Sequence, residues 1–540
     1  MKRYRQRICG SVTFQGIGLG IWMLFLSATG YTATITVAQD GSGNVATVQS
    51  AIATIQNGDE IVILDDGVYV EDLTAGAGFL MPASFTLRAA EGKTPTIRSA
   101  NQLSRLAAFG IAEIDYMGAA FLGCQNVLIE GITFENLAYE SNSASYAATI
   151  TIGDSIGVTV RNCTVRGAGS DPEKYPGLNS AFFIVGLGVI TAPTDILIES
   201  CSIVNFYKGF TIAEWPDPAA LGNPTVTVRN CTLMNGSLGI DAISSSYPES
   251  PDPSTTLAGS GLLFEDNYFS NLYYSGIMMS GGYAVIERNL FERCYTGIDI
   301  HYMPSLGVSP VIAKINECDF FDMDGDGLSV DAYNTETNVD ANPVNVDVTN
   351  SAFVGNDYFG VYVERGTTHF SNCIFTGNGL SAARISYATS TVTAKFDHCD
   401  FYRNNQIDYP EYPHFDDQFE ILIDPNNQPT RTEFTNCNIV GTRGILNGYM
   451  LNHSIYDPEA CIASFCNVFT ESDPLVNVVS DNILNFEPDY LSASVDPATF
   501  DKEGFQLTSG SILVTSGKEG TYIGSQGPAT SSAGSWDLYR

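Results

Sequence analysis

Charged residues are scarce in this sequence, and basic residues are the scarcest of them. Only 16% of the 540 residues are charged, with 25 Lys+Arg against 60 Asp+Glu. Four of the basic residues lie in an N-terminal segment that we expect to be removed, which leaves 21 against 60 and a formal charge of −39. This charge makes nucleic acid and anionic lipid poor partners, so we expect no nucleic-acid binding, and it repels polyuronates unless calcium or a local basic patch intervenes.

Long apolar runs are absent beyond the first 33 residues. The chain opens with four basic residues among the first seven, an apolar stretch over 17–26 and small residues over 28–33. This order predicts a signal peptide over 1–33. A signal anchor is the alternative, but the apolar stretch is short and rich in glycine. We therefore expect a secreted or cell-surface protein without integral membrane association.

Strong helix formers are outnumbered by residues that favour strands and turns, among them 51 glycines. One phrase, VTVRNCTV at 158–165, recurs in related form along most of the chain. Its anchor slot, occupied by Cys in seven copies, repeats every 22 to 38 residues, which matches one turn of a parallel β-helix with loops inserted. The anchor positions are Ile132, Cys163, Cys201, Cys231, Asn267, Asn289, Cys318, Ser351, Cys373, Cys399 and Cys437.

Each copy predicts a strand, a turn and a packed interior. Apolar residues alternate before the anchor, as at Val158 and Val160, so one face of the strand is buried. An Asn or Asp directly before the anchor suits a left-handed turn. These turn residues are Asn162, Asn230, Asp266, Asn350, Asn372 and Asn436. The anchor cysteines then stack as small apolar fillers beside a row of phenylalanines. The spacing leaves open whether Cys461 and Cys466 form a disulfide bridge.

The N-terminal part carries a more specific signature. The segment ITVAQDGSGNVATVQSAIATIQNGDEIVILDDGVYVED at 35–72 resembles the opening of pectin methylesterases and other members of the pectate-lyase-like superfamily. That resemblance implies an all-β fold, a right-handed single-stranded parallel β-helix, and residues 47–55 form the expected N-terminal capping helix. We expect the cap and first coils over 34–100, further coils over 101–470, and a C-terminal cap and tail over 471–540.

The resemblance stops at the superfamily. Pectin methylesterases keep their catalytic aspartates in a GxxDFIFG-type segment followed by LGRPW, and both are missing here. The NTD, GHG and RIK motifs of polygalacturonases are also missing. Because a fold does not carry a function, the activity must be argued from individual residues.

A second repeated phrase, such as GIDIH at 297–301 and GVYVE at 360–364, follows each anchor. Its alternate residues predict two outward rows. The first row contains Asp241, Met278, Asp299, Ser329 and Tyr362, and the second contains Ile243, Ser280, His301, Asp331 and Glu364. We interpret His301, Asp299, Asp331 and Glu364 as a catalytic acid/base cluster. Asp241, Tyr362, Tyr302 and Trp215 are the candidate substrate-binding residues. The alternative is a solvated acidic face.

Two features bear on the chemistry. The rows contain no Lys or Arg, which β-elimination needs, so hydrolysis by two carboxylates fits better. The segment DMDGDG at 322–327 matches the first half of a calcium loop, with Asp322, Asp324 and Asp326 as ligands, although Tyr333 stands where the loop needs Glu. The alternative is an ordinary turn of the repeat.

The sequence thus predicts a carbohydrate-active protein, hydrolase or lyase, acting on an extended polysaccharide laid across the coils. A non-catalytic adhesin or polysaccharide-binding module and a structural envelope protein are the alternatives.

Overall fold

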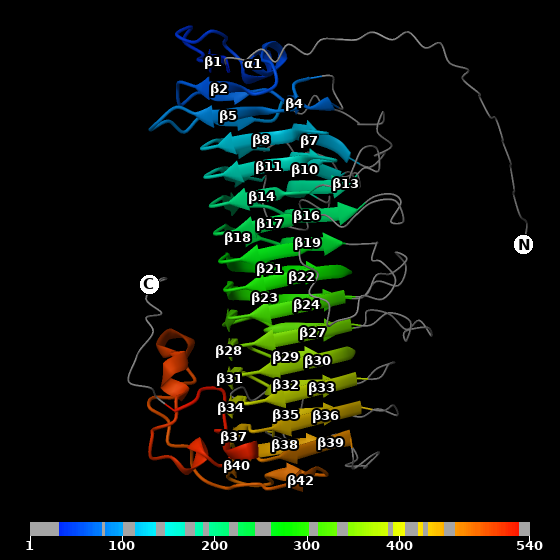
Figure 1. Cartoon of the computed structure of the whole chain (residues 1–540), viewed down its shortest axis with the longest axis vertical. Helices are drawn as coiled ribbons and strands as arrows, with labels where there is room; N and C mark the ends of the chain where they lie inside the picture. Colours follow the sequence, from blue (N-terminus) through cyan, green and yellow to red (C-terminus); the bar gives the residue numbers. More distant parts are fainter. Residues whose placement is uncertain are drawn as a thin grey trace, which may run out of the picture.

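The protein is a rod of stacked coils, each built from short parallel strands (Figure 1). The computed structural model describes residues 32–77, 81–100, 114–136, 146–167, 179–186, 194–214, 225–243, 261–301, 311–331, 344–386, 392–405, 419–424, 430–447 and 460–528. The strands of the coils form three faces, which we call the first, second and third face in chain order. Every strand pairs in parallel with its equivalent in the next coil, for example β11 with β14 and β10 with β13.

The first face holds the strands that precede the anchor slot. They are β1 (Thr34–Val37), β2 (Asp59–Ile63), β5 (Phe85–Ala89), β8 (Gln125–Glu130), β11 (Ile156–Arg161), β14 (Ile196–Glu199), β17 (Val226–Arg229), β20 (Leu262–Glu265), β22 (Gly282–Glu287), β24 (Val311–Asn316), β27 (Val344–Thr349), β30 (Gly366–Ser371), β33 (Val392–Asp397), β36 (Thr430–Thr435), β39 (Cys461–Ser464) and β42 (Val479–Asp481).

The second face follows the anchor. It contains β3 (Val68–Val70), β6 (Thr96–Arg98), β9 (Thr133–Glu135), β12 (Thr164–Arg166), β15 (Ser202–Val204), β18 (Thr232–Gly236), β25 (Asp319–Phe321), β28 (Ala352–Val354), β31 (Ile374–Thr376), β34 (Asp400–Tyr402), β37 (Asn438–Gly441) and β40 (Asn467–Thr470). Two long strands, β21 (Tyr268–Met279) and β23 (Leu290–His301), run through both the second and the third face.

The third face closes each coil. It contains β4 (Leu73–Ala75), β7 (Ile114–Leu122), β10 (Tyr146–Gly153), β13 (Asn179–Gly186), β16 (Lys208–Glu214), β19 (Leu238–Ile243), β26 (Leu328–Asp331), β29 (Phe359–Val363), β32 (Ser381–Ser386), β35 (Phe419–Asp424), β38 (Arg443–Asn447) and β41 (Leu475–Val476). The helix α1 (Val48–Thr54), capped by Thr47, lies at the N-terminal end of the rod and buries Val48, Ala51 and Ile52 (Figure 1). The predicted fold and capping helix are confirmed.

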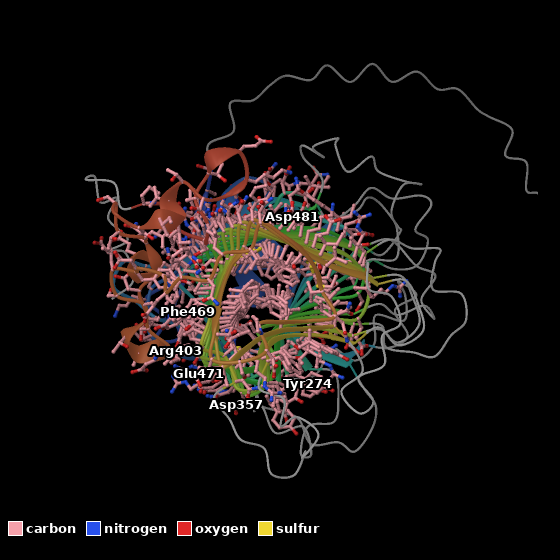
Figure 2. The ribbon with its side chains drawn as sticks, turned by 90° about the horizontal axis from the view of Figure 1, so that it is seen from below. Tyr274, Asp357, Arg403, Phe469, Glu471 and Asp481 are labelled. Carbon is pink, nitrogen blue, oxygen red and sulfur yellow. The ribbon has the colours of Figure 1, made fainter. Side chains whose placement is uncertain are left out.

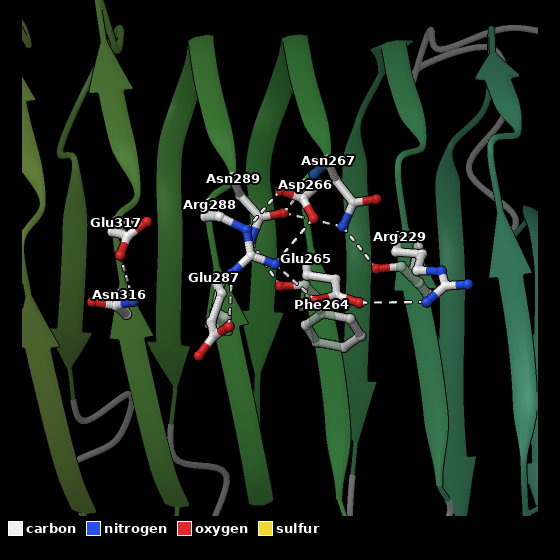
Figure 3. Close-up of polar contacts among 12 residues, drawn as sticks. Arg229, Phe264, Glu265, Asp266, Asn267, Glu287, Arg288, Asn289, Asn316 and Glu317 are labelled. Carbon is white, nitrogen blue, oxygen red and sulfur yellow. Dashed lines mark hydrogen bonds and ion pairs between the residues drawn. The ribbon is translucent and has the colours of Figure 1, made fainter. Parts of the chain in front are cut away.

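The bend between the first and second faces is a left-handed residue. All six predicted turn residues have a φ between 52° and 55°, a region that Asn and Asp tolerate better than most side chains. Asn372 donates from its side chain to the Oδ1 atom of Asn350 in the neighbouring coil at 3.4 Å. The anchor slot that follows is buried. In two adjacent coils it is Asn, and the side chain of Asn267 donates to the Oδ1 atom of Asn289 at 3.0 Å (Figure 3).

Like side chains stack along the interior. Six phenylalanines that follow the anchors form one column with ring centres 4.6 to 5.0 Å apart. They are Phe269, Phe291, Phe320, Phe353, Phe375 and Phe401. Cys461 and Cys466 are both free and buried. They are not bridged because Cys461 lies on β39 of the first face, whereas Cys466 fills the next anchor slot after the left-handed Phe465.

An ion-pair ladder runs along the outside of the first face, as the alternating charges of Glu130, Arg161, Glu199, Arg229 and Glu265 predict. Arg161 bonds to Glu130 at 2.8 Å, and Arg229 contacts Glu199 at 2.6 Å and Glu265 at 3.9 Å. Figure 3 shows the C-terminal end of this ladder, where Arg288 bonds to both Glu265 and Asp266. Because these groups are partly exposed, each pair contributes little, roughly 0–1 kcal/mol.

The C-terminal tail turns back along the second face (Figure 1). It contains the short 3-10 helices η6 (Pro497–Thr499), η7 (Lys502–Phe505), η8 (Ile512–Val514) and η9 (Lys518–Gly520). Phe500 and Phe505 pack against Ala352 and Val354. Buried Asp400 of β34 accepts hydrogen bonds from Tyr490 and, at 2.7 Å, from the backbone N–H of Ser525. The tail therefore covers this part of the second face.

Candidate carbohydrate site on the third face

The first predicted row exists as a line of neighbours across the third face. Asp299 of β23 pairs with Ser329 of β26, and Ser329 pairs with Tyr362 of β29. On the other side, Asp299 pairs with Met278, which pairs with Asp241. The residues on either side of Asp299, Ile298 and Ile300, are buried, so the row points away from the core.

The second row places the other three predicted catalytic residues on adjacent coils. His301 and Asp331 are partners in register at the ends of β23 and β26. Only the backbone of His301 belongs to the described residues. Glu364 donates its N–H to the carbonyl of Val330 at 2.8 Å, which places it beside Asp331 in the next coil. Successive coils are about 4.8 Å apart, so Asp331 and Glu364 can act on one sugar.

Arg384 of β32 lies in the first row, next to Tyr362. Its guanidinium carbon is 5.6 Å from the ring centre of Phe359 and 5.5 Å from that of Tyr362. The expectation that the row lacks a basic residue is therefore wrong. The reason is local: Ala382 occupies the slot that Gly360 and its equivalents fill, so the strand does not carry the phrase that marks its neighbours.

Asp326 adds a fourth carboxylate, and its surroundings raise its pKa. Its side chain accepts a hydrogen bond from the backbone N–H of Phe359 at 3.1 Å. Burial raises the pKa of Asp326 to about 7, and the negative charges of Asp299 and Asp331 act in the same direction, while the Phe359 bond and the positive charge of Arg384 oppose them. A carboxyl group with a pKa near neutrality is suited to general acid catalysis.

Glu364 and Tyr362 form a second coupled pair. Burial raises the pKa of Glu364, and Asp331 raises it further, against the hydrogen bond that Tyr362 donates to it. Burial and the same hydrogen bond raise the pKa of the Tyr362 phenol. We call Asp299, Asp326, Asp331 and Glu364 the carboxylate cluster. All four are partly exposed, and Arg384 lies among them.

The remaining predicted sugar contacts have different surroundings. Asp241 forms an ion pair with Lys208, and the two side chains are only 1% and 13% exposed. Asp241 is separated from Asp299 by the coil that carries Met278. Tyr302 and Trp215 lie outside the described residues.

The segment predicted to be a calcium loop spans the corner between the second and third faces. Asp322 takes the left-handed conformation, with φ 53°, and both Asp322 and Asp324 are exposed. Asp326 turns instead toward the N–H of Phe359. Among the residues that the structure describes, no group of three or more His, Cys, Asp or Glu side chains is arranged to hold a metal ion. Calcium binding stays a prediction.

Comparison with known proteins identifies the fold. Residues 221–346, from just before β17 into β27, match a family model described as right handed beta helix region. No curated protein matches the sequence. The protein is a right-handed parallel β-helix protein, which is the fold that its resemblance to the pectate-lyase-like superfamily implies. Within the described residues no helix is long and apolar enough to cross a membrane.

Several solved structures are similar. PfbA, a surface adhesin of Streptococcus pneumoniae, has 12% identity and a TM-score of 0.41 over 74% of this chain and 85% of its own. The family 28 exopolygalacturonase of Yersinia enterocolitica has 10% identity and a TM-score of 0.42 over 77% of this chain and 78% of its own. The AlgE6 A-module of Azotobacter vinelandii, a mannuronan C-5 epimerase, has 13% identity and a TM-score of 0.38 over 82% and 96%. Likeness at this level gives no activity.

Proposed function

We propose that this protein hydrolyses glycosidic bonds in an extended, uncharged polysaccharide, and that the carboxylate cluster carries out the reaction. The supporting observation is the position of Asp326, an acid whose pKa is about 7 among three other carboxylates. Glycoside hydrolysis needs one carboxylic acid that is protonated and a second that is available as a base or nucleophile.

In this proposal Asp326 donates its proton to the oxygen of the leaving sugar as the glycosidic bond breaks. Asp331 activates water or attacks the anomeric carbon. Positive charge develops on the sugar ring in the transition state, and the carboxylates of Asp299 and Glu364 stabilise it. Arg384 keeps the cluster from accumulating too much negative charge, and it is held in place over the Phe359 and Tyr362 rings.

Elimination from a uronate fits less well. A guanidinium such as that of Arg384 keeps its proton in proteins, and the raised pKa of Tyr362 holds the phenol protonated at neutral pH. Lys208 is engaged with Asp241. The formal charge of −35 also repels an anionic polymer.

The test is a panel of uncharged and uronate-containing polysaccharides, assayed both for new reducing ends and for unsaturated uronate absorbance. The proposal expects reducing ends from at least one uncharged polymer and no unsaturated product. Unsaturated product, or no product from any polymer, would reject hydrolysis. Binding without product would favour the alternative, a surface adhesin or binding module, which the exposed Tyr273 and Tyr274 on the same side of the rod also suit.

We also propose that the protein is exported through a signal peptide over residues 1–33, a segment whose first 31 residues lie outside the described part of the chain. Fractionation of expressing bacteria and mass spectrometry of the mature N-terminus test this. A cytoplasmic protein that keeps its first residues would contradict it.

A further inference from the structure

Three tyrosines on two neighbouring coils are unusually exposed for large aromatic side chains. Tyr273, Tyr274 and Tyr295 are 66%, 55% and 47% exposed. They lie within β21 and β23, where those strands turn from the second face to the third. The rings of Tyr273 and Tyr274 are 6.4 Å apart and inclined by 56°. Grouped exposed aromatic side chains mark a binding surface more often than isolated ones do.

The register aligns this corner along the axis of the rod. Ser275 pairs with Thr296, so Tyr274 and Tyr295, which precede them, lie on adjacent coils. The next coil places Gly325 beside Tyr295, where a Cβ atom would lie 2.6 Å from the Tyr295 carbonyl oxygen and 3.5 Å from its ring. Glycine thus leaves the Tyr295 ring uncovered.

One coil further on, Tyr358 donates its N–H to the carbonyl of Gly325 at 3.1 Å. The corner therefore runs Tyr274, Tyr295, Gly325, Tyr358, over a length of about 15 Å at the spacing of parallel strands. Figure 2, a view along the axis, shows Tyr274 and Asp357, the residue before Tyr358, on the same edge of the coils.

This corner continues into the carboxylate cluster. Asp326 directly follows Gly325, and Phe359, whose N–H bonds to Asp326, directly follows Tyr358. Tyr295 is close enough to Tyr358, Asp326 and Tyr274 for their charges to raise the pKa of its phenol, after burial. A polymer lying on the tyrosines would therefore reach Asp326 without leaving the surface.

The charges beside the tyrosines select the ligand. Asp324 and Asp357 are exposed at the same corner, and the charge of Asp324 raises the pKa of Asp357 after burial does. Carboxylates accept hydrogen bonds from sugar hydroxyls, but they repel uronate and sulfate groups. The apolar face of a sugar ring stacks on an aromatic side chain whether or not the polymer is charged.

We propose that Tyr274, Tyr295 and Tyr358 form a stacking track that binds an uncharged glycan parallel to the rod axis and delivers it to Asp326. The identity of the glycan as a substrate rests on the proposed hydrolysis, whereas the track itself rests on the tyrosines. The track differs from the candidate contacts Tyr302, Trp215 and Asp241, which lie elsewhere in the chain.

The test measures polysaccharide affinity in the Asp326→Asn background, so that no ligand is consumed. Tyr274→Ala and Tyr295→Ala should each weaken binding of an uncharged polysaccharide about 2- to 12-fold. Tyr274→Phe and Tyr295→Phe, which keep the ring, should bind within about 2-fold of the parent. Phe486→Ala is the matched control, because Phe486 is 45% exposed but lies in the C-terminal tail.

Unchanged affinity in both alanine variants would overturn the track, as would tighter binding of a uronate polymer than of any uncharged one. The two proposals fail separately. If Asp326→Asn abolishes hydrolysis while the alanine variants bind as the parent does, hydrolysis stands and the track is wrong. If the alanine variants lose binding but the unmodified protein releases no reducing ends, the track stands and the proposed hydrolysis is wrong.

Discussion

Arg384 lies over the ring of Tyr362 on the adjacent strand, with its guanidinium carbon 5.5 Å from the ring centre. The contact holds a fixed positive charge beside the carboxylate cluster. That charge favours the ionised form of Asp326, against the burial that raises its pKa to about 7. The stacking of Arg384 therefore helps to set the pH range over which Asp326 keeps its proton.

Replacing Arg384 should move the alkaline limb of the pH–rate profile. Without the guanidinium the pKa of Asp326 rises, so Arg384→Gln keeps the acid protonated to higher pH, by on the order of half a pH unit. The profile of kcat/KM against pH measures this. Arg384→Lys retains the charge and is the control. A limb that moves to lower pH in Arg384→Gln, or that moves equally in both variants, would contradict the assignment.

Glu420 should make the protein less stable as pH rises. Its buried carboxyl ends a ladder of Asn356, Asn378 and Asn404, and Asn404 donates to it from its side chain at 2.7 Å. Burial raises its pKa from 4.5 to about 8, so between these values the folded state binds more protons than the unfolded one. The free energy of unfolding therefore falls as pH rises across this window, by on the order of 2–5 kcal/mol from this group.

Urea denaturation of wild type and Glu420→Gln between pH 4.5 and 8 isolates that contribution. The neutral variant should show a flatter dependence on pH, because it has no proton to lose. An identical slope in both proteins would mean that Glu420 titrates alike in the folded and unfolded states.

The phenylalanine column should be a main source of stability. Phe320 is fully buried, with its ring centre 4.9 Å from that of Phe291 and 4.6 Å from that of Phe353. Phe320→Ala removes both contacts and leaves a cavity, at a cost of about 3–5 kcal/mol in chemical denaturation. Phe486→Ala, at an exposed position, should change stability by less than about 0.5 kcal/mol. Equal effects of the two substitutions would refute the stacked core.

Calcium binding at Asp322, Asp324 and Asp326 would raise the melting temperature, and because a metal-bound carboxylate is ionised it is an alternative to the role of Asp326 as the acid. A calcium concentration 100 times Kd stabilises the folded state by about 2.7 kcal/mol. The rise should disappear in Asp322→Asn combined with Asp324→Asn, which leaves Asp326 intact for catalysis. Identical melting curves with and without calcium would show that the segment does not bind the ion. The proposed hydrolysis would be unaffected, because it uses no metal.

The sequence predicted the coils because each repeat must satisfy the same local geometry. Left-handed turns select Asn and Asp, as at Asn162 and Asn230, and the narrow interior selects Cys and Phe at fixed offsets. Those offsets fixed which residues share a row, so the pairing of Asp299 with Ser329 and of His301 with Asp331 followed from counting along the chain.

The features that could not be predicted from the sequence lie where the repeat departs from its pattern. Arg384 was missed because Ala382 stands where the second repeated phrase has its glycine in the neighbouring coils. The extra residue between the anchor and the glycine in β21 produces a register irregularity between Leu272 and Ser275, and Tyr273 and Tyr274 lie in it. The residues between Asn404 and Glu420 do not follow the repeat, so the sequence does not show that these two side chains meet. The raised pKa of Asp326 depends on burial and on charges from other coils, which the spacing of the repeats does not reveal.

The most direct measurement is the pH–rate profile of Asp326→Asn on an uncharged polysaccharide that the wild type cleaves. Loss of the general acid predicts a fall in kcat of about 10²- to 10⁴-fold and the disappearance of the alkaline limb near pH 7, with unchanged binding. A variant that retains wild-type kcat and the same limb would show that the carboxylate cluster is not where this protein does its chemistry.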